Sequence, residues 1–431
     1  MTPGGRLAAA IEVLDAMAAR HRPVGEALKE WGTSHRFAGS KDRAAIGNIV
    51  YDALRWRTSS AWIMGEESSR AMVLAAVAQH WGLGPEVLDA AIEGDAHAPS
   101  PLTDDERLRL SGATLDSAPA HVRADVPEWL AERFATTFGD DWVEEGAALA
   151  GRPPLDMRVN RLKAEREKVA KALVAFHPAE TVLAPDGLRI AATEAAGRHP
   201  NVQVEPGFVK GLFEIQDEGS QVASLLSGAK PGEQILDLCA GAGGKALAMA
   251  AVMENKGQVF ATDSDRARLA PIFDRLKRAA TRNVQVRPAR SDLSDLHGRM
   301  DAVLLDVPCT GTGTWRRRPD AKWRLTEKAL TDRIAEQSAL LDAATVYLKP
   351  GGRIVYVTCS LLPDENDQRL SAFLADHDDF SLVPPAEVLA AAALSDAAKE
   401  ALQVAVGDTG LLLTPRRTET DGFFVGVVRR S

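Results

Sequence analysis

The chain has 431 residues, of which 45% are hydrophobic and 26% charged, and its formal net charge is −9. This is an ordinary globular composition, with enough length for two or three domains. No uninterrupted apolar run reaches the ~18 residues that a membrane-spanning helix needs, and three cysteines cannot form a disulfide framework. The composition therefore excludes membrane-spanning, disulfide-stapled and disordered classes, and it predicts a cytoplasmic protein.

The acidic charge is concentrated in one segment. Residues 61–150 hold 17 acidic and five basic side chains, whereas residues 1–60 hold nine basic and six acidic ones. Phosphate binding needs a local basic surface and not a basic total, so the negative net charge leaves a nucleic-acid partner open.

Apolar residues recur at helical spacing through the first part of the chain, as in Leu7, Ile11 and Leu14. A further helix is predicted over 127–148, because a Gly-Arg-Pro-Pro sequence follows and breaks the pattern. These observations predict a helical domain over residues 1–150.

The pattern changes after residue 150. Residues 155–160 and 187–191 are predicted to be short strands, with a helix over 163–175 between them. The sequence thus predicts a small α+β module over residues 151–230.

Strand-like and helix-like segments alternate from residue 231 to 431. The predicted strands are 234–239, 258–263, 284–289, 301–306 and 353–359, and the predicted helices are 244–253, 265–279, 325–348 and 364–376. This alternation predicts a doubly wound parallel sheet with helices on both faces. Two strand-like segments, 410–415 and 422–430, are predicted to close it as a pair.

A glycine-rich turn follows the first strand of this region. Gly241, Gly243 and Gly244 let the backbone approach a ligand where a Cβ would collide, and Asp263 ends the next strand, where a ribose acceptor is needed. The turn has neither the phosphate-binding P-loop pattern nor the GxGxxG register. It therefore indicates a nucleoside cofactor without a pyrophosphate, namely S-adenosylmethionine, although a tight strand–helix connection would have a similar sequence.

The strand over 301–306 ends at Asp306 and leads into Pro308 and Cys309, and a basic segment interleaved with Trp315 and Trp323 follows. The cations of this segment are Arg316, Arg317, Arg318, Lys322 and Arg324. Basic groups beside flat aromatic rings suit phosphates and unstacked bases. The alternative is a solvated loop anchored by its two tryptophans.

All three cysteines, Cys239, Cys309 and Cys359, occupy the ends of predicted parallel strands at one edge of the sheet. A single cysteine is more often a small buried apolar residue. Three at the ligand-binding edge favour chemistry there. A metal site is disfavoured, because no CxxC pattern or neighbouring His pair accompanies them.

Three segments resemble the RsmB/Sun family of RNA cytosine-5 methyltransferases: CAGAGGK (239–245), DVPCTGTGTWRRRPDAKW (306–323) and TCSLLPDEN (358–366). Ala242 departs from the family pattern, in which many relatives have Pro. The resemblance implies a class I methyltransferase-like sheet over 231–431, preceded by an all-α NusB-like domain and a small RNA-contacting module.

The resemblance also implies roles for individual residues. Cys359 would be the nucleophile that adds to carbon 6 of cytosine, Asp306 would position the base, and Cys309 would assist release. Lys245 would either lower a thiol pKa or orient Asp306. No metal is implied.

Two sets of binding residues follow from the same resemblance. The cofactor set is Cys239, Ala240, Gly241, Ala242, Gly243, Gly244, Lys245, Asp263 (ribose), Asp292 (adenine) and Asp306. The RNA-binding set is Arg158, Asn160, Arg316, Arg317, Arg318, Lys322 and Arg324.

The expected partner is a structured RNA, with 16S ribosomal RNA favoured and transfer RNA as an alternative. No membrane partner is expected, and the chain is expected to be a monomer. A catalytically silent RNA-binding assembly factor is the competing class. A methyltransferase for a small molecule or a protein is a third, since one fold serves many substrates.

Overall fold

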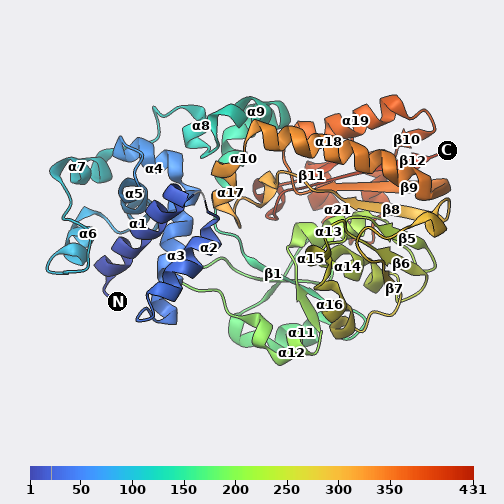
Figure 1. Cartoon of the computed structure of the whole chain (residues 1–431), viewed down its shortest axis with the longest axis horizontal. Coiled ribbons are helices and arrows are strands. Elements are labelled where there is room, and N and C mark those ends of the chain that lie inside the picture. The colour runs from blue at the N-terminus through green and yellow to red at the C-terminus, as the bar shows by residue number, and fades with distance from the viewer. Residues whose placement is uncertain (21) are drawn as a thin grey trace. The chain divides into compact units, whose positions relative to one another are not determined.

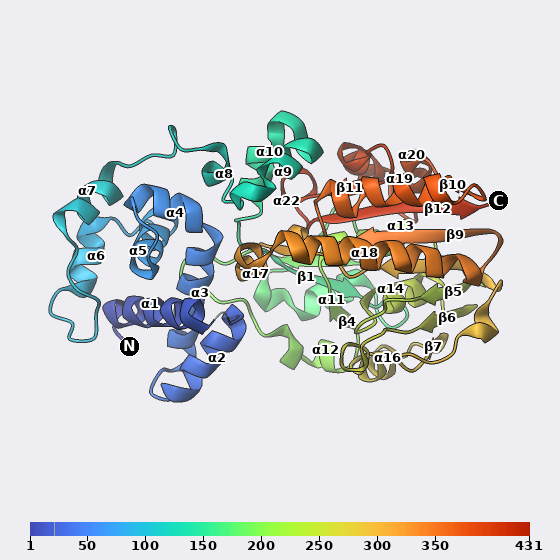
Figure 2. The ribbon, with the colours of Figure 1, turned by 45° about the horizontal axis from the view of Figure 1, so that its top comes forward.

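The computed structural model describes residues 1–20 and 22–431 and divides them into two compact units. The helical unit comprises residues 1–153, 192–199 and 315–324, and the sheet unit comprises 154–191, 200–314 and 325–431. Figures 1 and 2 show the elements of each unit from two directions. Among the described residues, no helix is long and apolar enough to cross a membrane.

The helical unit contains eleven of the α-helices of the described residues. They are α1 Pro3–Arg20, α2 Val24–Ser34, α3 Ser40–Arg55, α4 Arg57–Met64, α5 Ser69–His80, α6 Pro85–Ile92, α7 Asp104–Gly112, α8 Ala120–Arg123, α9 Ala131–Phe138, α10 Trp142–Ala148 and α17 Pro319–Arg324. Their apolar faces meet in one core around Leu14, Ile46 and Leu74, all of which are buried. The prediction of an all-α N-terminal domain is confirmed.

Two predicted helices are interrupted. The helix expected over 127–148 is wrong as a single element, because Gly139 separates α9 from α10 with a positive φ of 58°, a conformation that glycine adopts readily. The helix expected over 265–279 is likewise divided at Pro271 into two shorter helices. Proline lacks the N–H that would continue the hydrogen-bond ladder.

Residues 315–324 belong to the helical unit although they follow a strand of the sheet unit. The Trp315 ring is 1% exposed and stacks on Phe134 with ring centroids 5.8 Å apart. Lys322 Nζ donates to the Arg55 carbonyl at 3.0 Å, and Trp323 Nε1 donates to the Leu54 carbonyl. This segment therefore packs against α3 and α9 and is not a solvated loop.

The sheet unit begins with a small antiparallel sheet in the order β2-β3-β1-β4. Its strands are β1 Leu155–Val159, β2 Ala179–Glu180, β3 Gly187–Ile190 and β4 Phe213–Ile215. Met157, Leu188 and Phe213 are fully buried in its own core. This is the α+β module that the strand and helix patterns predict.

The main sheet has the order β10-β12-β9-β8-β5-β6-β7, and β11 also pairs with β12. Its strands are β5 Gln234–Asp237, β6 Gln258–Ala261, β7 Val284–Val286, β8 Met300–Asp306, β9 Leu348–Thr358, β10 Phe380–Leu382, β11 Leu411–Leu413 and β12 Phe423–Arg430. Strands β5 to β9 are parallel, whereas β12 runs antiparallel to β9 and to both of its other partners. The predicted parallel sheet and closing pair are confirmed.

Helices cover both faces of this sheet (Figure 2). The helices of the sheet unit are α11 Arg166–Ala172, α12 Pro206–Val209, α13 Glu218–Leu226, α14 Gly244–Val252, α15 Arg266–Leu269, α16 Ile272–Ala279, α18 Glu327–Ala344, α19 Asp367–Asp376, α20 Pro385–Ala391, α21 Asp396–Ala401 and α22 Pro415–Thr418. Consecutive strand residues point to opposite faces. Thus Ile235 packs in the cluster of α13, α14 and α16, whereas Leu236 packs in the cluster of α18 and α19. The carboxyl ends of β5, β6, β8 and β9 then lie at one edge.

Candidate active site

The glycine-rich turn joins β5 to α14, and its conformation requires glycine at two positions. Gly241 has a φ of 49° and Gly243, the N-cap of α14, has a φ of 81°. A Cβ on Gly243 would lie 2.5 Å from Ile272 Cγ1, which is closer than packed carbon atoms allow.

We expect Gly243→Ala to lower the free energy of unfolding by about 2–4 kcal/mol, because it adds backbone strain and overpacks Ile272. Chemical denaturation measures this directly. The adjacent Gly244→Ala is the matched control, since its Cβ would meet only ordinary contacts at 3.9 Å. Equal stabilities for the two variants would contradict the packing argument.

Asp263 follows β6, and its carboxylate anchors the turn. The side chain is buried, its Oδ2 accepts from the Gly241 N–H at 2.9 Å, and its Oδ1 accepts from the Asp265 N–H at 2.8 Å. Arg268 is 3.7 Å from the same carboxylate. Asp263 therefore holds the turn in shape, and each of its oxygens keeps a further acceptor position.

Lys245 and Asp306 form an ion pair at the ends of α14 and β8. Lys245 Nζ donates to Asp306 Oδ2 at 2.6 Å and lies 5.2 Å from the centre of the Phe423 ring. Burial raises the pKa of neighbouring Asp237 to about 8, and the charge of Asp306 adds to this shift. Of the two roles predicted for Lys245, this contact favours the one in which it orients Asp306.

Two cavities open beside these residues. One, of about 400 Å³, is lined by most of turn residues 239–245 together with Arg268, Arg275 and Asp306. The other, of about 860 Å³, begins at Ser264, the residue directly after Asp263.

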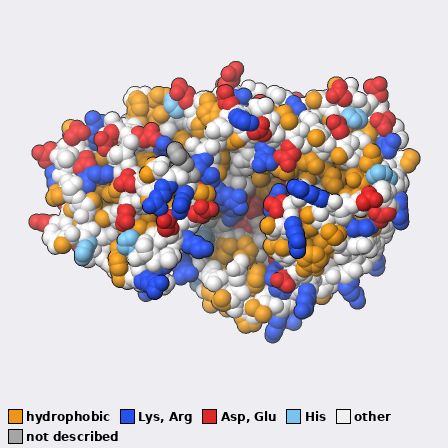
Figure 3. Space-filling view, in the orientation of Figure 1, with side chains coloured by type: hydrophobic (Ala, Val, Ile, Leu, Met, Phe, Trp, Pro, Cys, Tyr) orange, Lys and Arg blue, Asp and Glu red, His pale blue; other side chains and the backbone are white. Residues whose placement is uncertain are grey.

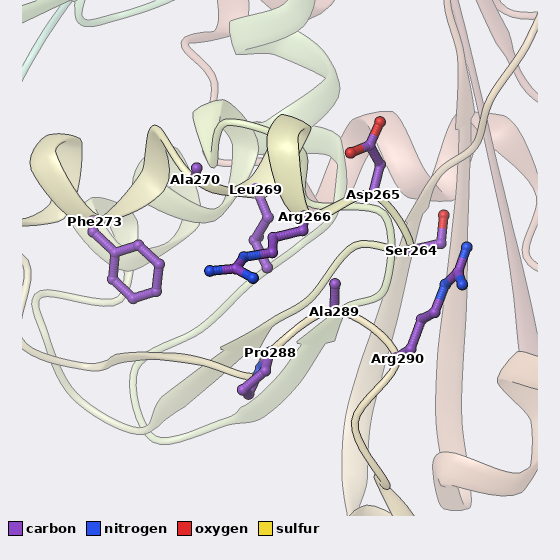
Figure 4. A pocket seen from close by; sticks show the side chains of 9 residues that line it. All are labelled: Ser264, Asp265, Arg266, Leu269, Ala270, Phe273, Pro288, Ala289 and Arg290. Atoms are coloured by element: carbon purple, nitrogen blue, oxygen red, sulfur yellow. The ribbon is translucent and has the colours of Figure 1, made fainter.

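Figure 4 shows the larger cavity. Arg266 and Phe273 reach it from α15 and α16, whereas Pro288 and Arg290 reach it from the segment after β7. Asp292, predicted to lie near the adenine, does not line this cavity. It is exposed and accepts hydrogen bonds from the backbone and hydroxyl of Ser294, and these bonds lower its pKa.

These residues fit S-adenosylmethionine. The turn leaves one cavity open, and Asp263, which holds the turn, directly precedes Ser264 in the lining of the other cavity. The turn residues would hold the amino-acid part of the cofactor, and Asp263 and the larger cavity would hold its nucleoside.

Two of the three cysteines meet. Cys309 follows β8, Cys359 follows β9, and their Sγ atoms are 3.3 Å apart. The hydrogen bond with Cys359 and burial raise the pKa of the Cys309 thiol well above its usual value. Cys239 is buried at the turn, and desolvation raises its pKa as well. The predicted juxtaposition of Cys309 and Cys359 is therefore found in the structure.

A buried polar network, which the sequence patterns did not predict, lies behind this pair. Glu365 is 0% exposed and accepts hydrogen bonds from Thr310 and Gln337. The Thr312 hydroxyl accepts from the Leu361 N–H at 2.7 Å. The sequence signal was the acidic pair Asp364 and Glu365 in TCSLLPDEN, which by itself is typical of an exposed helix start.

The prediction that Arg158 and Asn160 face RNA needs correction. Arg158 is buried and donates to the Gln216 side chain at 2.7 Å. Asn160 is also buried and donates to the Gly211 and Ala279 carbonyls. Both belong to strand β1 or its end, where the side chains are held inside the sheet unit and cannot meet a phosphate from solvent.

The basic segment 315–324 is divided in the same way. Arg316 and Lys322 are buried in the helical unit, so their prediction as phosphate contacts is corrected too. Arg318 and Arg324 are exposed, Arg317 is half-buried, and Arg324 pairs with Asp320 at 3.0 Å. Residue type alone does not reveal which of these cations are buried.

Two family models match the chain. One, described as 16S rRNA methyltransferase RsmB/F, matches residues 224–429, and the other, the ferredoxin-like domain of RsmF/B-like methyltransferases, matches residues 126–195.

Curated relatives match over a longer part of the chain. Ribosomal RNA small subunit methyltransferase B of Erwinia tasmaniensis is 31% identical over 385 residues, which are 81% of this chain and 86% of that protein. The probable ribosomal RNA small subunit methyltransferase B of Synechocystis is 32% identical over 71% of this chain and 67% of that protein. The Klebsiella pneumoniae methyltransferase B is 36% identical, but the match spans only 59% of its length.

Solved structures agree on the fold. The structure of PH0851 covers 100% of this chain with a TM-score of 0.70 and 26% identity, and 99% of that chain is matched. A methyltransferase homolog from Pyrococcus horikoshii covers 72% of this chain and 98% of its own, with a TM-score of 0.57 and 28% identity. With the site described above, these matches confirm the resemblance seen in the sequence: the chain belongs to the RsmB/F (RsmB/Sun) family of S-adenosylmethionine-dependent methyltransferases and has their class I fold.

Proposed function

We propose that this protein methylates carbon 5 of a cytosine in RNA, with 16S ribosomal RNA as the substrate, through a covalent adduct with Cys359. The observation that carries the proposal is the contact between Cys309 and Cys359, whose Sγ atoms are 3.3 Å apart at the same sheet edge as the Lys245–Asp306 pair. Methyl transfer to an oxygen or nitrogen atom needs no thiol pair, whereas carbon 5 of cytosine is a poor nucleophile and needs activation.

The first half of the reaction activates the ring. The Cys359 thiolate adds to carbon 6, a C–S bond forms, and the ring electrons move to carbon 5. Asp306 holds the base at ring nitrogen 3 and the exocyclic amine, where it favours the protonated adduct, and Lys245 fixes the orientation of its carboxylate. S-adenosylmethionine, when bound, would supply an electrophilic methyl group, which carbon 5 takes up as the thioether S-adenosylhomocysteine leaves. The target base must be unpaired or flipped out of its stack.

The second half releases the product. Carbon 5 loses its proton to a base, the electron pair re-forms the bond between carbons 5 and 6, and Cys359 leaves as a thiolate. Cys309 assists this step as a general base or through one.

The names of the curated relatives, which are small-subunit ribosomal RNA methyltransferases, support the choice of RNA. Lys and Arg side chains occur among acidic and apolar ones on the face in Figure 3, so local basic surface exists despite the negative total. We place RNA contacts at Arg317, Arg318 and Arg324, whose side chains are not buried.

Bisulfite sequencing of total RNA from a strain that lacks this gene tests the function. The expected result is loss of one methylcytosine signal in 16S ribosomal RNA and its return on complementation. Loss of a signal in transfer RNA would keep the chemistry and change the substrate. An unchanged methylcytosine map, with every site retained, would contradict the proposal.

We expect Asp263→Asn to weaken binding of S-adenosylmethionine about 10- to 100-fold, because the proposed charge-assisted bond to the ribose would be lost together with one of the two backbone bonds that Asp263 accepts. Isothermal titration measures the affinity without RNA. Asp274→Asn, an exposed carboxylate on α16, is the matched control. Unchanged affinity in Asp263→Asn would remove this residue from the cofactor site.

A further inference from the structure

A buried carboxylate holds the residue that follows Cys309. Glu365 ends the short helix Pro363–Glu365 and has no exposed surface. Its Oε1 accepts from the Thr310 backbone N–H at 2.9 Å, and its Oε2 accepts from the Thr310 hydroxyl. Both the main chain and the side chain of Thr310 are therefore fixed by one carboxylate.

Gln337 holds the residue before Cys309 in the same way, through a hydrogen bond to its backbone. It is fully buried on α18, and its Nε2 donates both to Glu365 Oε1 and to the Pro308 carbonyl, each at 2.9 Å. The chain on both sides of Cys309 is thus held by two contacting side chains, a glutamate and a glutamine. The Cys359 carbonyl accepts a different hydrogen bond, from the Gly313 N–H at 2.9 Å in the loop that follows Cys309.

The charge of Glu365 is not offset by a cation. Among residues 1–20 and 22–431, no Lys or Arg forms an ion pair with it, and the hydrogen bonds it accepts come from an amide N–H, a hydroxyl and a side-chain amide. A buried carboxylate without a counter-ion is costly to the fold, which favours a reason other than stability for its presence. Its charge also helps to raise the pKa of the Cys309 thiol, after the Cys359 hydrogen bond and burial.

We propose that Glu365 is a positioning residue for Cys309, and that it acts on product release and not on the first methyl transfer. This inference rests on the proposed function, because it assigns Glu365 to one of the two half-reactions described above. The reason is geometric. The side chains of Glu365 and Gln337 hold the chain directly on both sides of Cys309, whereas Glu365 reaches the Cys359 segment only through the Thr310 hydroxyl, which lies 3.4 Å from the Ser360 hydroxyl.

The test compares Glu365→Gln, Cys309→Ser and the unaltered full-length protein on a 16S ribosomal RNA transcript with tritiated S-adenosylmethionine. We expect Glu365→Gln to transfer the first methyl group within about threefold of the normal single-turnover rate. Multiple turnover should fall roughly 10- to 100-fold, and a denaturation-resistant RNA–protein complex should accumulate. A structural role alone would slow both phases equally and would leave no complex.

The matched control is Glu218→Gln. Glu218 is also a buried carboxylate that accepts two loop backbone N–H groups, those of Leu183 and Ala184, but it contacts neither cysteine loop. It should accumulate no complex. Should Glu365→Gln fail to fold, Thr310→Val removes the hydroxyl contact and leaves Glu365 in place. It should likewise slow multiple turnover more than the first methyl transfer, but by a smaller factor.

The possible outcomes separate the two proposals. If Cys309→Ser traps a complex but neither Glu365→Gln nor Thr310→Val does, the positioning role is overturned and the proposed function stands. If both phases fall together without a complex, the role is overturned as well. If not even Cys309→Ser traps a complex, the covalent mechanism fails and this inference fails with it.

Discussion

Replacement of Cys359 by alanine is expected to lower methyl transfer by at least about 10³-fold, because Cys359 forms the bond to carbon 6 in the proposed mechanism. Its thiol contacts only Cys309 among the three cysteines, and Cys239 lies at the cofactor turn with a raised pKa. Transfer of a tritiated methyl group to RNA gives the rate. The signal from the variant should be close to the signal measured without enzyme.

The control for this variant is cofactor binding. Cys359 is not one of the residues that line the cavities at the turn and at Ser264, so titration with S-adenosylmethionine should give an unchanged affinity. Loss of activity with intact cofactor binding supports the nucleophile. Full activity in Cys359→Ala would overturn the assignment.

Replacement of Cys309 by serine is expected to trap the RNA on the enzyme. The first methyl transfer needs only Cys359, whereas release needs a group at position 309 to help remove the carbon 5 proton. Serine is nearly isosteric with cysteine, but it is a far weaker acid and would not replace the thiol. Denaturing gel electrophoresis with labelled RNA should show most of the enzyme in a slow-migrating complex, compared with a few per cent or less for the unaltered protein.

The double variant Cys309→Ser, Cys359→Ala identifies the sulfur in that complex. The complex should disappear, since the C–S bond can form only at Cys359. If Cys359 variants trapped the complex and Cys309→Ala abolished activity instead, the two roles would be exchanged, and the inference about Glu365 would then apply to the nucleophile.

The sequence predicted the part of this molecule that local patterns encode. Strands β5 to β9 and the glycine turn follow from hydrophobic runs and from the residues that end them. Because parallel strands present their carboxyl ends at one edge of a sheet, the sequence also predicted that Cys309 and Cys359 lie close together, as the structure shows. Among the helices, the breaks at Gly139 and Pro271 were not predicted, since a pattern of apolar residues continues across them.

Burial and long-range partners were beyond the reach of these patterns. Arg158 and Lys322 are of the residue type that contacts RNA, but both are buried. Glu365 lies in a sequence typical of a solvated helix start, but it is buried behind Cys309. The sequence by itself determined the sheet and the turn, because these depend on neighbours along the chain. The tertiary structure alone decided which charges are buried and which side chains hold Cys309, because such contacts join residues that are tens to hundreds of positions apart.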